Sequence, residues 1–201
     1  SVVCSDKTGT LTQNKMTVQR IWVPGRTLNV SGSGYRAQGA VEENGRLVQA
    51  ARDAALGRLC EAASLCTTAH ITRAKDVYDV MGDPTEVAVL VAAAKAGVTK
   101  EALLQQYTVI GENPFDAARK RMSVTVSGPG GVRLLCKGAP DMLLARCTHI
   151  ETPAGPRLLA PRDRADINAA CARMAASSPN WASTPPFCRA AACLTLSWSG
   201  M

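Results

Sequence analysis

Residues 122–137 read Met-Ser-Val-Thr-Val-Ser-Gly-Pro-Gly-Gly-Val-Arg-Leu-Leu-Cys-Lys. Apolar and small polar side chains alternate over Met122–Ser127, which is the period of a strand with one buried face. Ser127–Gly131 combines serine, proline and three glycines, the composition of a turn, and a second strand-like run, Val132–Lys137, follows it. The stretch therefore predicts an antiparallel hairpin, and with it a sheet that has one face in the core.

Helices are predicted on both sides of this hairpin in the sequence. Before it, Asp83 can cap a helix, Pro84 suits the first turn, and Glu86 completes a capping box. That helix is expected to run to about Lys95 and to stop at Gly97. Further helices are expected over Arg52–Cys66, after Thr99, over Pro140–Cys147 and over Arg162–Ala176, and further strands within Gln19–Glu43, Tyr107–Gly111 and Thr148–Arg157. This order predicts an α/β fold in which an antiparallel sheet of about six strands is flanked by helices.

The composition limits the class of protein. Of the 201 residues, 46% are hydrophobic and 19% are charged, which argues for a packed core and against a disordered or fibrous chain. No run of about 18 or more apolar residues occurs, so no membrane-spanning segment is expected in this sequence. The formal net charge of +7 favours an anionic partner: nucleic acid, a lipid surface or a phosphorylated small molecule. Aromatic residues make up only 4%, which argues against a base-stacking RNA surface.

The cysteines do not indicate a metal site. There are eight of them without any Cys-x-x-Cys spacing, and only two histidines, so zinc is not expected. A chain of this length and apolar content does not need disulfides in order to fold. We therefore expect reduced thiols that pack as small hydrophobic side chains in a cytosolic protein.

The N-terminal run Cys4-Ser5-Asp6-Lys7-Thr8-Gly9-Thr10-Leu11-Thr12 carries the most specific chemistry. The residues before Asp6 read as the end of a buried strand, where a carboxylate projects into the crevice in which open α/β sheets bind ligands. Asp6 could there act as a nucleophile that accepts a phosphoryl group. Lys7 and backbone N–H groups near Gly9 would balance phosphate charge. The alternative is a turn in which Asp6 and Thr8 only satisfy local backbone donors.

This run resembles the phosphorylation signature of P-type ATPases, the ion pumps that form an aspartyl-phosphate, and the match is complete over residues 6–12. The resemblance implies that Asp6 is the phosphorylated residue and that Thr8 contacts the transferred phosphate. It also implies Mg²⁺ as a cofactor, held by Asp6 and by the backbone carbonyl of Thr8. The catalytic residues carried over by the resemblance are Asp6, Lys7, Thr8, Gly9 and Thr10.

Two further stretches resemble the type II branch of this family, which holds calcium and sodium/potassium pumps. Gln13-Asn14-Lys15-Met16-Thr17-Val18 is similar to the continuation of the signature in that branch. Gly34–Gly39 is similar to the Gly-Tyr-x-Pro-x-Gly stretch of calcium-type pumps, with Ala37 in the proline position. The resemblance therefore favours a calcium-type pump, whose ion ligands would lie in membrane helices that this sequence does not contain.

Thr8 also separates the chain from the haloacid-dehalogenase phosphatases that resemble these pumps. Those phosphatases usually carry a second Asp two residues after the nucleophile, as a general acid and base. A threonine hydroxyl cannot act as an acid or base near pH 7. A phosphoenzyme without that group should live longer, which suits a pump that holds the intermediate while it changes shape.

Three more segments resemble the nucleotide pocket of the same family: Gly82–Glu86, Pro114–Ser123 and Lys137–Asp141. The resemblance implies that ATP is bound, with Glu86 near the adenine amino group. It places Phe115 on the adenine ring, a contact worth about 1–3 kcal/mol by analogy with base stacking. The other implied nucleotide-binding residues are Lys120, Met122, Lys137, Gly138 and Ala139. Ala117 stands where calcium pumps often carry an Arg, so that phosphate contact is not expected.

Each of these segments also has a structural interpretation. Glu86 is already explained as a capping residue, Phe115 could be a core residue, and Arg119–Arg121 could be a solvated basic face. Lys137 and Gly138 could form an ordinary strand-to-helix turn, although a glycine there would also let the backbone approach a nucleotide and its phosphates.

The sequence is expected to divide into three parts. Residues 1–18 resemble the start of a Rossmann-like phosphorylation domain, and residues 19–176 resemble the nucleotide-binding domain. Residues 177–201 contain no acidic residue and one basic residue, Arg189. We expect this last part to be a tail foreign to the fold, which arises from a reading-frame change or a fusion.

The expected function is that of a fragment of an ATP-driven cation pump. It would be soluble, belong to the cytoplasmic face of the membrane protein, bind ATP weakly and not turn over. Its expected partners are ATP and the membrane, actuator and remaining phosphorylation-domain segments of the same pump, with no nucleic acid. One alternative is a non-catalytic basic module that binds polyanions without nucleotide preference. The other is a haloacid-dehalogenase-type phosphatase fragment, which would hydrolyse small phosphate esters by itself.

Overall fold

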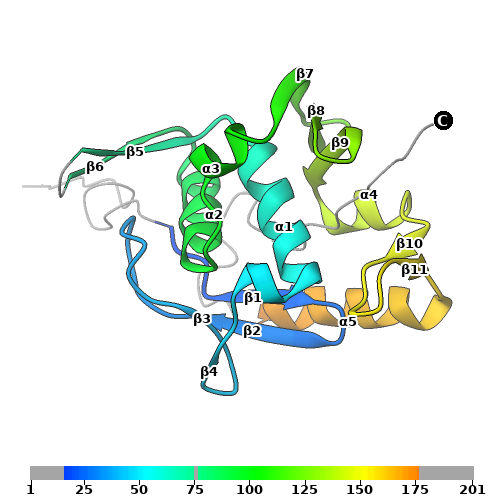
Figure 1. Cartoon of the computed structure of the whole chain (residues 1–201). Helices are drawn as coiled ribbons and strands as arrows, with labels where there is room; N and C mark the ends of the chain where they lie inside the picture. The colour runs from blue at the N-terminus through cyan, green and yellow to red at the C-terminus, as the bar shows by residue number, and fades with distance from the viewer. Residues whose placement is uncertain (1–15, 75–76, 177–201) are drawn as a thin grey trace, which may run out of the picture.

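The computed structural model describes residues 16–74 and 77–176, which form helices and antiparallel sheets (Figure 1). The strands are β1 (Arg20–Val23), β2 (Arg26–Val30), β3 (Val41–Glu43), β4 (Arg46–Leu47), β5 (His70–Ala74), β6 (Val77–Met81), β7 (Thr108–Asp116), β8 (Arg121–Gly128), β9 (Gly131–Gly138), β10 (His149–Ile150) and β11 (Arg157–Leu158). The helices are α1 (Ala54–Leu65), α2 (Pro84–Lys95), α3 (Lys100–Leu104), α4 (Pro140–Leu144), α5 (Pro161–Ala176) and a 3₁₀ helix over Ala50–Arg52. The predicted mixture of helices and antiparallel strands is confirmed.

The strands divide into several sheets, whereas the sequence suggested a single one. Within the described residues there is a four-stranded sheet, β1-β2-β3-β4, a three-stranded sheet, β7-β8-β9, and the two-stranded pairs β5-β6 and β10-β11. The expectation of one sheet is thus wrong. Each group consists of strands that follow one another along the chain, and helices or longer connections separate one group from the next.

The hairpin predicted over residues 122–137 is confirmed as β8 and β9. Its register pairs Met122 with Lys137 and closes with Gly128 opposite Gly131. The inward positions Met122, Val124 and Val126 of β8 are buried, as their alternation predicted. Strand β7 pairs with the other edge of β8 and continues to Asp116, beyond the predicted end at Gly111.

Helix α1 connects the two larger sheets (Figure 1). Its N-terminal half contributes Leu56, Leu59 and Cys60 to a cluster with the four-stranded sheet and the end of α2. Its C-terminal half contributes Ala62 and Leu65 to a second cluster, with the inward side chains of β8 and β9. One amphipathic helix therefore supplies apolar residues to two neighbouring parts of the core.

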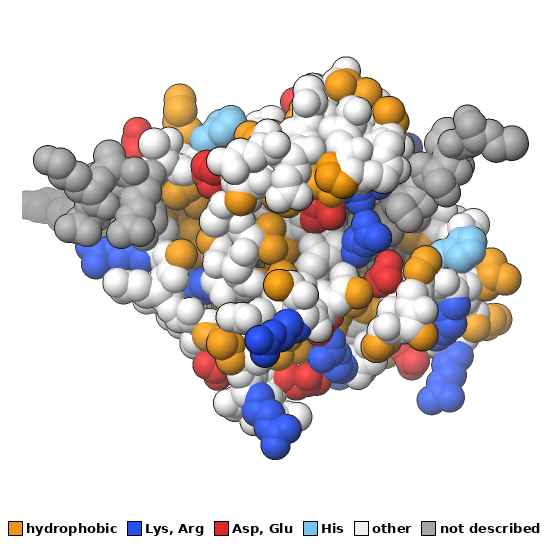
Figure 2. Space-filling model, viewed as in Figure 1, with side chains coloured by type: hydrophobic (Ala, Val, Ile, Leu, Met, Phe, Trp, Pro, Cys, Tyr) orange, Lys and Arg blue, Asp and Glu red, His pale blue; other side chains and the backbone are white. Residues whose placement is uncertain are grey.

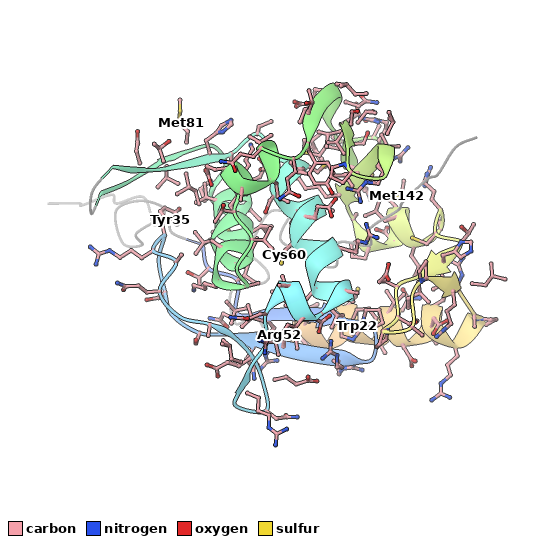
Figure 3. The ribbon with its side chains drawn as sticks, viewed as in Figure 1. Trp22, Tyr35, Arg52, Cys60, Met81 and Met142 are labelled. Carbon is pink, nitrogen blue, oxygen red and sulfur yellow. The ribbon has the colours of Figure 1, made fainter. Side chains whose placement is uncertain are left out.

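Strand β1 is buried on both faces. Ile21 and Val23 face the cluster formed with α1 and α2. Trp22 faces the opposite way and packs with Ile167 and Ala170 of α5, and Figure 3 shows it beside that helix. The four-stranded sheet is thus covered by α1 and α2 on one face and by α5 on the other.

The helix boundaries agree closely with the sequence signals. The Asp83 side chain accepts from the Thr85 N–H at 2.8 Å, and α2 ends at Lys95, two residues before Gly97, whose φ is 90°. Helix α4 ends at Leu144 and is shorter than the predicted Pro140–Cys147 segment. The β5-β6 hairpin, with His70 opposite Met81, was not predicted.

The cysteines of the described part pack as predicted. Cys60, Cys66, Cys136 and Cys147 are buried and Cys171 is half-buried, all as free thiols. Burial raises the pKa of the Cys60 thiol to about 12, and the charge of Asp53 adds to the effect. No helix among the described residues is both long and apolar enough to cross a membrane.

Candidate functional site

Two of the predicted site residues, Glu86 and Lys137, form an ion pair between α2 and β9. Lys137 Nζ donates to Glu86 Oε1 at 2.5 Å, and the two side chains are only 14% and 9% exposed. The residues are 51 positions apart in the sequence. The fold therefore brings together two predicted segments that lie far apart in the sequence.

Glu86 is set in place by the start of α2. Asp83 caps the helix and Pro84 begins it, so Glu86 lies in the first turn. The carboxylate does not form the predicted capping box, because its two oxygens are engaged elsewhere in the described structure. Oε1 receives Lys137, and Oε2 receives donors from Thr67–Ala69, which follow α1 and are called here the Thr67–Ala69 turn.

The Thr67–Ala69 turn directs a set of hydrogen-bond donors to the Glu86 carboxylate. The Thr67 hydroxyl donates to Oε2 at 2.8 Å, and the Thr68 hydroxyl and N–H donate at 2.9 and 3.0 Å. The Ala69 N–H completes the set at 3.2 Å. Charged acceptors make stronger hydrogen bonds than neutral ones, so this turn holds the carboxylate firmly.

Lys100 fastens the same turn from its other side. Its Nζ donates to the Thr67 carbonyl at 3.0 Å and to the Ala69 carbonyl at 2.9 Å. Burial lowers the pKa of the Lys100 ammonium, and the nearby charge of Glu86 opposes that effect. Lys100 therefore brings a second positive charge close to Glu86.

The electrostatic environment keeps Glu86 ionised although it is buried. Burial alone would raise the pKa of this carboxyl. The Lys137 ammonium and the hydroxyls of Thr67 and Thr68 outweigh burial and lower the pKa from 4.5 to about 2. Glu86 is therefore a fixed negative charge and hydrogen-bond acceptor at neutral pH.

Lys137 and Gly138 lie at the end of β9, where the chain passes close to β8. The Ala139 N–H donates to the Lys120 carbonyl at 2.9 Å. A Cβ at Gly138 would lie 2.4 Å from the Lys120 carbonyl oxygen and 2.5 Å from the Arg121 Cβ. The glycine thus permits a close approach of two backbone segments, both of which carry predicted site residues.

Phe115 lies near the end of β7, and Lys120 is the last residue of the turn that leads into β8. Phe115 is 42% exposed, so the alternative in which it belongs to the core is wrong. Lys120 is exposed and adopts a left-handed backbone conformation with φ 50°. Arg119 lies along the same turn and donates to Asn113 Oδ1 and to the Pro114 carbonyl.

Met122 occupies a different environment from the other predicted residues. Its side chain is 2% exposed and packs with Ala62, Leu65 and Cys66 under the three-stranded sheet. It lies directly opposite Lys137 in the register, so it supports the strand from which Lys137 extends. The remaining predicted residues, Asp6, Lys7, Thr8, Gly9 and Thr10, lie outside the described residues.

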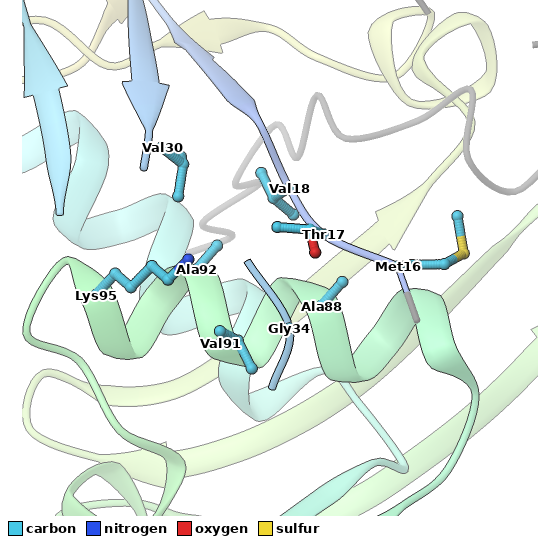
Figure 4. A pocket seen from close by; sticks show the side chains of 9 residues that line it. All are labelled: Met16, Thr17, Val18, Val30, Gly34, Ala88, Val91, Ala92 and Lys95. Carbon is cyan, nitrogen blue, oxygen red and sulfur yellow. The ribbon is translucent and has the colours of Figure 1, made fainter. Parts of the chain in front are cut away.

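Two hollows in the described part do not include the predicted nucleotide residues. One lies against α2 and is lined by Met16, Thr17, Val18, Val30, Gly34, Ala88, Val91, Ala92 and Lys95 (Figure 4). The other is an open hollow of about 310 Å³ between α1, the 3₁₀ helix and Leu103 of α3, on the face shown in Figure 2. Its lining is made largely of small and apolar residues, together with the two charged residues Arg58 and Glu61.

Sequence reasoning missed Thr67, Thr68 and Lys100. Their contacts with Glu86 and with one another span 18 to 33 residues of sequence. No spacing rule connects a pair of threonines after one helix with a lysine that begins another. The sequence assigned a capping role to Glu86, so no side-chain partners were predicted for it.

Comparison with known proteins agrees with this architecture. The family described as "P-type ATPase, cytoplasmic domain N" matches residues 55–181. A calcium-transporting ATPase of Bacillus subtilis is 38% identical over 179 residues, which cover 89% of this chain and 20% of that protein. The cation-transporting ATPase pma1 of Synechocystis is 34% identical, over 84% of this chain and 19% of its own length. A calcium-transporting ATPase type 2C member 1 of Pongo abelii is also 34% identical, over 87% and 19%.

The helices and antiparallel sheets of the described residues define an α/β protein. The chain belongs to the P-type ATPase family, and the matched region is its cytoplasmic domain N. It spans about a fifth of the length of the curated relatives that it matches.

Proposed function

We propose that this chain binds ATP as the nucleotide-binding part of an ATP-driven cation pump of the calcium type. The observation that carries the proposal is the Glu86–Lys137 pair, formed between two of the segments that resemble the family's nucleotide pocket. The names of the relatives, which include calcium-transporting ATPases from bacteria and from Pongo abelii, support the assignment of the ion class.

The chemistry of the paired residues suits a nucleotide. Lys137 supplies a positive charge for phosphate oxygens, and the Glu86 carboxylate supplies an acceptor for the amino group of adenine. The partly exposed Phe115 offers an aromatic face for the base. Since Lys137 is bound to Glu86 in the ligand-free chain, phosphate oxygens would compete with the carboxylate for the same ammonium group.

The phosphoryl transfer in the proposed pump involves Asp6. An Asp6 carboxylate oxygen attacks the γ-phosphorus of ATP, the bond from that phosphorus to the β,γ-bridging oxygen breaks, and ADP leaves with the electron pair. Asp6 and the proposed Mg²⁺ ligand Thr8 lie outside the described residues. For the described part of the chain, the proposal therefore concerns nucleotide binding alone, on the cytoplasmic side of the membrane and without turnover by this chain.

Calorimetric titration of the 201-residue chain with ATP tests this proposal. The wild-type chain is expected to bind ATP, and Lys137→Ala is expected to weaken binding at least about tenfold, since a hydrogen bond to a charged group contributes about 1.5–3 kcal/mol. The variant also leaves Glu86 buried without its cation, which costs stability. Circular dichroism should therefore confirm that the variant is folded.

Arg133→Ala is a matched control for this experiment. Arg133 lies on β9, on the same face as Lys137, and pairs with Glu61 of α1 at a similarly buried position. The control should lose stability for the same reason and still bind ATP like the wild-type chain. A folded wild-type chain without affinity for ATP would refute the proposal, and so would equal binding by Lys137→Ala and wild type.

A further inference from the structure

The two oxygens of the Glu86 carboxylate have different surroundings. Oε2 receives four donor groups from the Thr67–Ala69 turn, at 2.8 to 3.2 Å. Among the described residues, Oε1 receives a single donor, Lys137 Nζ. A carboxylate oxygen offers about two lone-pair directions, so Oε2 is fully occupied and Oε1 is not. A ligand that donates to Glu86 must therefore do so at Oε1.

The orientation of Oε1 depends on the conformation of the Thr67–Ala69 turn. Any rotation of the carboxylate about its last bond, short of the half-turn that merely exchanges its two equivalent oxygens, would break the contacts with Thr67, Thr68 and Ala69. Those contacts hold only while the N–H groups of Thr68 and Ala69 point to the same spot. Whatever fixes this turn also fixes the acceptor that Glu86 presents.

Lys100 fixes the turn. Its Nζ bridges the Thr67 and Ala69 carbonyls, which lie on either side of Thr68. Lys100 is the first residue of α3, and Thr99 caps that helix through the Ala102 N–H. Figure 1 shows α3 near the end of α1 and the start of β5, between which the turn lies. The ammonium group therefore ties the turn to a separate helix.

We infer that Lys100 is a positioning residue for base recognition: by clamping the Thr67–Ala69 turn, it holds Glu86 so that Oε1 accepts from the exocyclic amino group of adenine. The inference rests on the proposed function. Adenine carries an amino donor at this position, whereas guanine carries a carbonyl acceptor, which the carboxylate would repel. Lys100 thus sets the preference for adenine over guanine without touching the base.

The preference itself is the measurement that tests the inference. Dissociation constants of ATP and GTP are determined for the 201-residue chain and for Lys100→Met, which keeps the length of the side chain and removes the clamp. The ATP-over-GTP ratio, meaning the affinity for ATP divided by the affinity for GTP, is expected to fall about tenfold, a change of about 1.4 kcal/mol. The reason is that ATP binding weakens and GTP binding does not. Lys100→Arg can still donate to two carbonyls and should restore most of the ratio.

Lys95→Met is the matched control. Lys95 is buried, whereas Lys100 is half-buried, and Lys95 Nζ likewise donates to two backbone carbonyls, those of Ser31 and Gly32, at 2.7 and 3.1 Å. Burial lowers its pKa as it does that of Lys100. Loss of this clamp should reduce stability to a similar extent and leave the ATP-over-GTP ratio unchanged.

The outcomes distinguish a positioning role of Lys100 in base recognition from a role that does not depend on the base. An unchanged ratio in Lys100→Met, or an equal loss of affinity for both nucleotides, overturns the inference and leaves the proposed function intact. A wild-type chain that binds no ATP overturns the proposed function, and the inference with it. If Lys100→Met does not fold, Thr68→Val takes its place, since it removes one hydroxyl donor to Oε2 and should lower the same ratio.

Discussion

Glu86 is a buried carboxylate that five donor groups keep in its charged form. Four come from the Thr67–Ala69 turn and the fifth is the Lys137 ammonium. Desolvation of a charge is costly, and it is offset here by hydrogen bonds that all favour the ionised state. The same contacts that make Glu86 a fixed acceptor for a ligand therefore also make it a source of stability.

This source of stability should depend on pH. The pKa of Glu86 is about 2 in the folded chain, against an ordinary value of 4.5, so the unfolded chain takes up a proton first as the pH falls. The contribution is present in full above about pH 4.5 and is lost as the pH falls toward about 2. It amounts to at most about 3 kcal/mol, at about 1.36 kcal/mol for each pKa unit.

Urea unfolding of wild type and Glu86→Gln between pH 6 and pH 3 measures this contribution. Glu86→Gln should be less stable at pH 6, because Lys137 loses its counter-charge, and should approach the wild type as the pH falls. Parallel stability curves for the two proteins would contradict the assigned role of the carboxylate.

At the residue scale, the sequence predicted part of the site. Glu86 and Lys137, which the structure pairs, were predicted because each lies in a short segment that resembles a known family, and Phe115 stays a prediction on the same ground. Thr67, Thr68 and Lys100 act through backbone N–H and carbonyl groups or through hydroxyls, which many residue types could supply. Only the folded conformation of the turn shows that these groups converge on one carboxylate.

At the scale of the element, the end of β9 tolerates fewer residue types than the exposed turn between β8 and β9 does. Gly138 lies opposite Arg121, and its Cα faces the Lys120 carbonyl at the beginning of β8. Any Cβ there would meet backbone atoms, which cannot move aside as a flexible side chain can. The strand-to-helix passage from Lys137 to Pro140 thus requires a glycine for packing, independently of any ligand.

Gly138→Ala should therefore destabilise the chain by about 1–3 kcal/mol, the usual cost of forcing an added methyl group into packed surroundings. Gly111→Ala is the matched control, because Gly111 lies in β7 of the same sheet and its Cβ would meet only the Thr125 side chain, at 3.7 Å. The control should be neutral or stabilising by up to about 1 kcal/mol, since alanine costs less backbone entropy than glycine. Denaturant unfolding of both variants makes the comparison, and equal effects would show that the close approach is not limiting.

The elements themselves were predictable where local signals are strong. The β8-β9 hairpin and α2 carry alternation, turn residues and caps, and both were found with nearly correct ends. The β5-β6 hairpin carries β-prone residues in both strands, such as Ile71 and Val80, but the sequence between the strands, Lys75-Asp76, contains no glycine or proline to indicate a turn, and the hairpin was missed. The division into several sheets depends on which strands meet after the helices have packed, and no local signal records that.

At the scale of the whole molecule, the positive charge is distributed over many elements. On the face shown in Figure 2, Lys and Arg side chains form several separate groups, with Asp and Glu side chains among them. Several are paired within the described part, such as Arg26 with Glu43 and Arg157 with Asp163. The net charge of +7 therefore does not by itself indicate a polyanion surface, and the buried pair of Lys137 with Glu86 is a more specific place for an anion.

The parts of the molecule are joined by a small number of apolar residues. Helix α1 connects the two larger sheets, and β1 connects α1 with α5 through Trp22. In the cluster around α5, Ile167 is fully buried against residues from β1, α4 and β10, namely Trp22, Leu144 and Ile150. A cavity at Ile167 would thus weaken contacts among segments from both ends of the described chain.

Ile167→Ala should destabilise the chain by about 2–5 kcal/mol, through lost burial and the cavity that remains. A small domain has about 5–15 kcal/mol of stability in total, so the unfolding midpoint should move substantially. The affinity for ATP should not change under conditions in which the variant is folded, because the side chains around Glu86 and Lys137 belong to other clusters.

Ile110→Ala, at a position that is 56% exposed, is the matched control and should change stability by less than about 0.5 kcal/mol. Thermal and urea unfolding, with ATP titration of the folded proteins, measure both effects. If the two alanine variants were equally stable, α5 would not be part of the cooperative core, and the domain would end before Pro161.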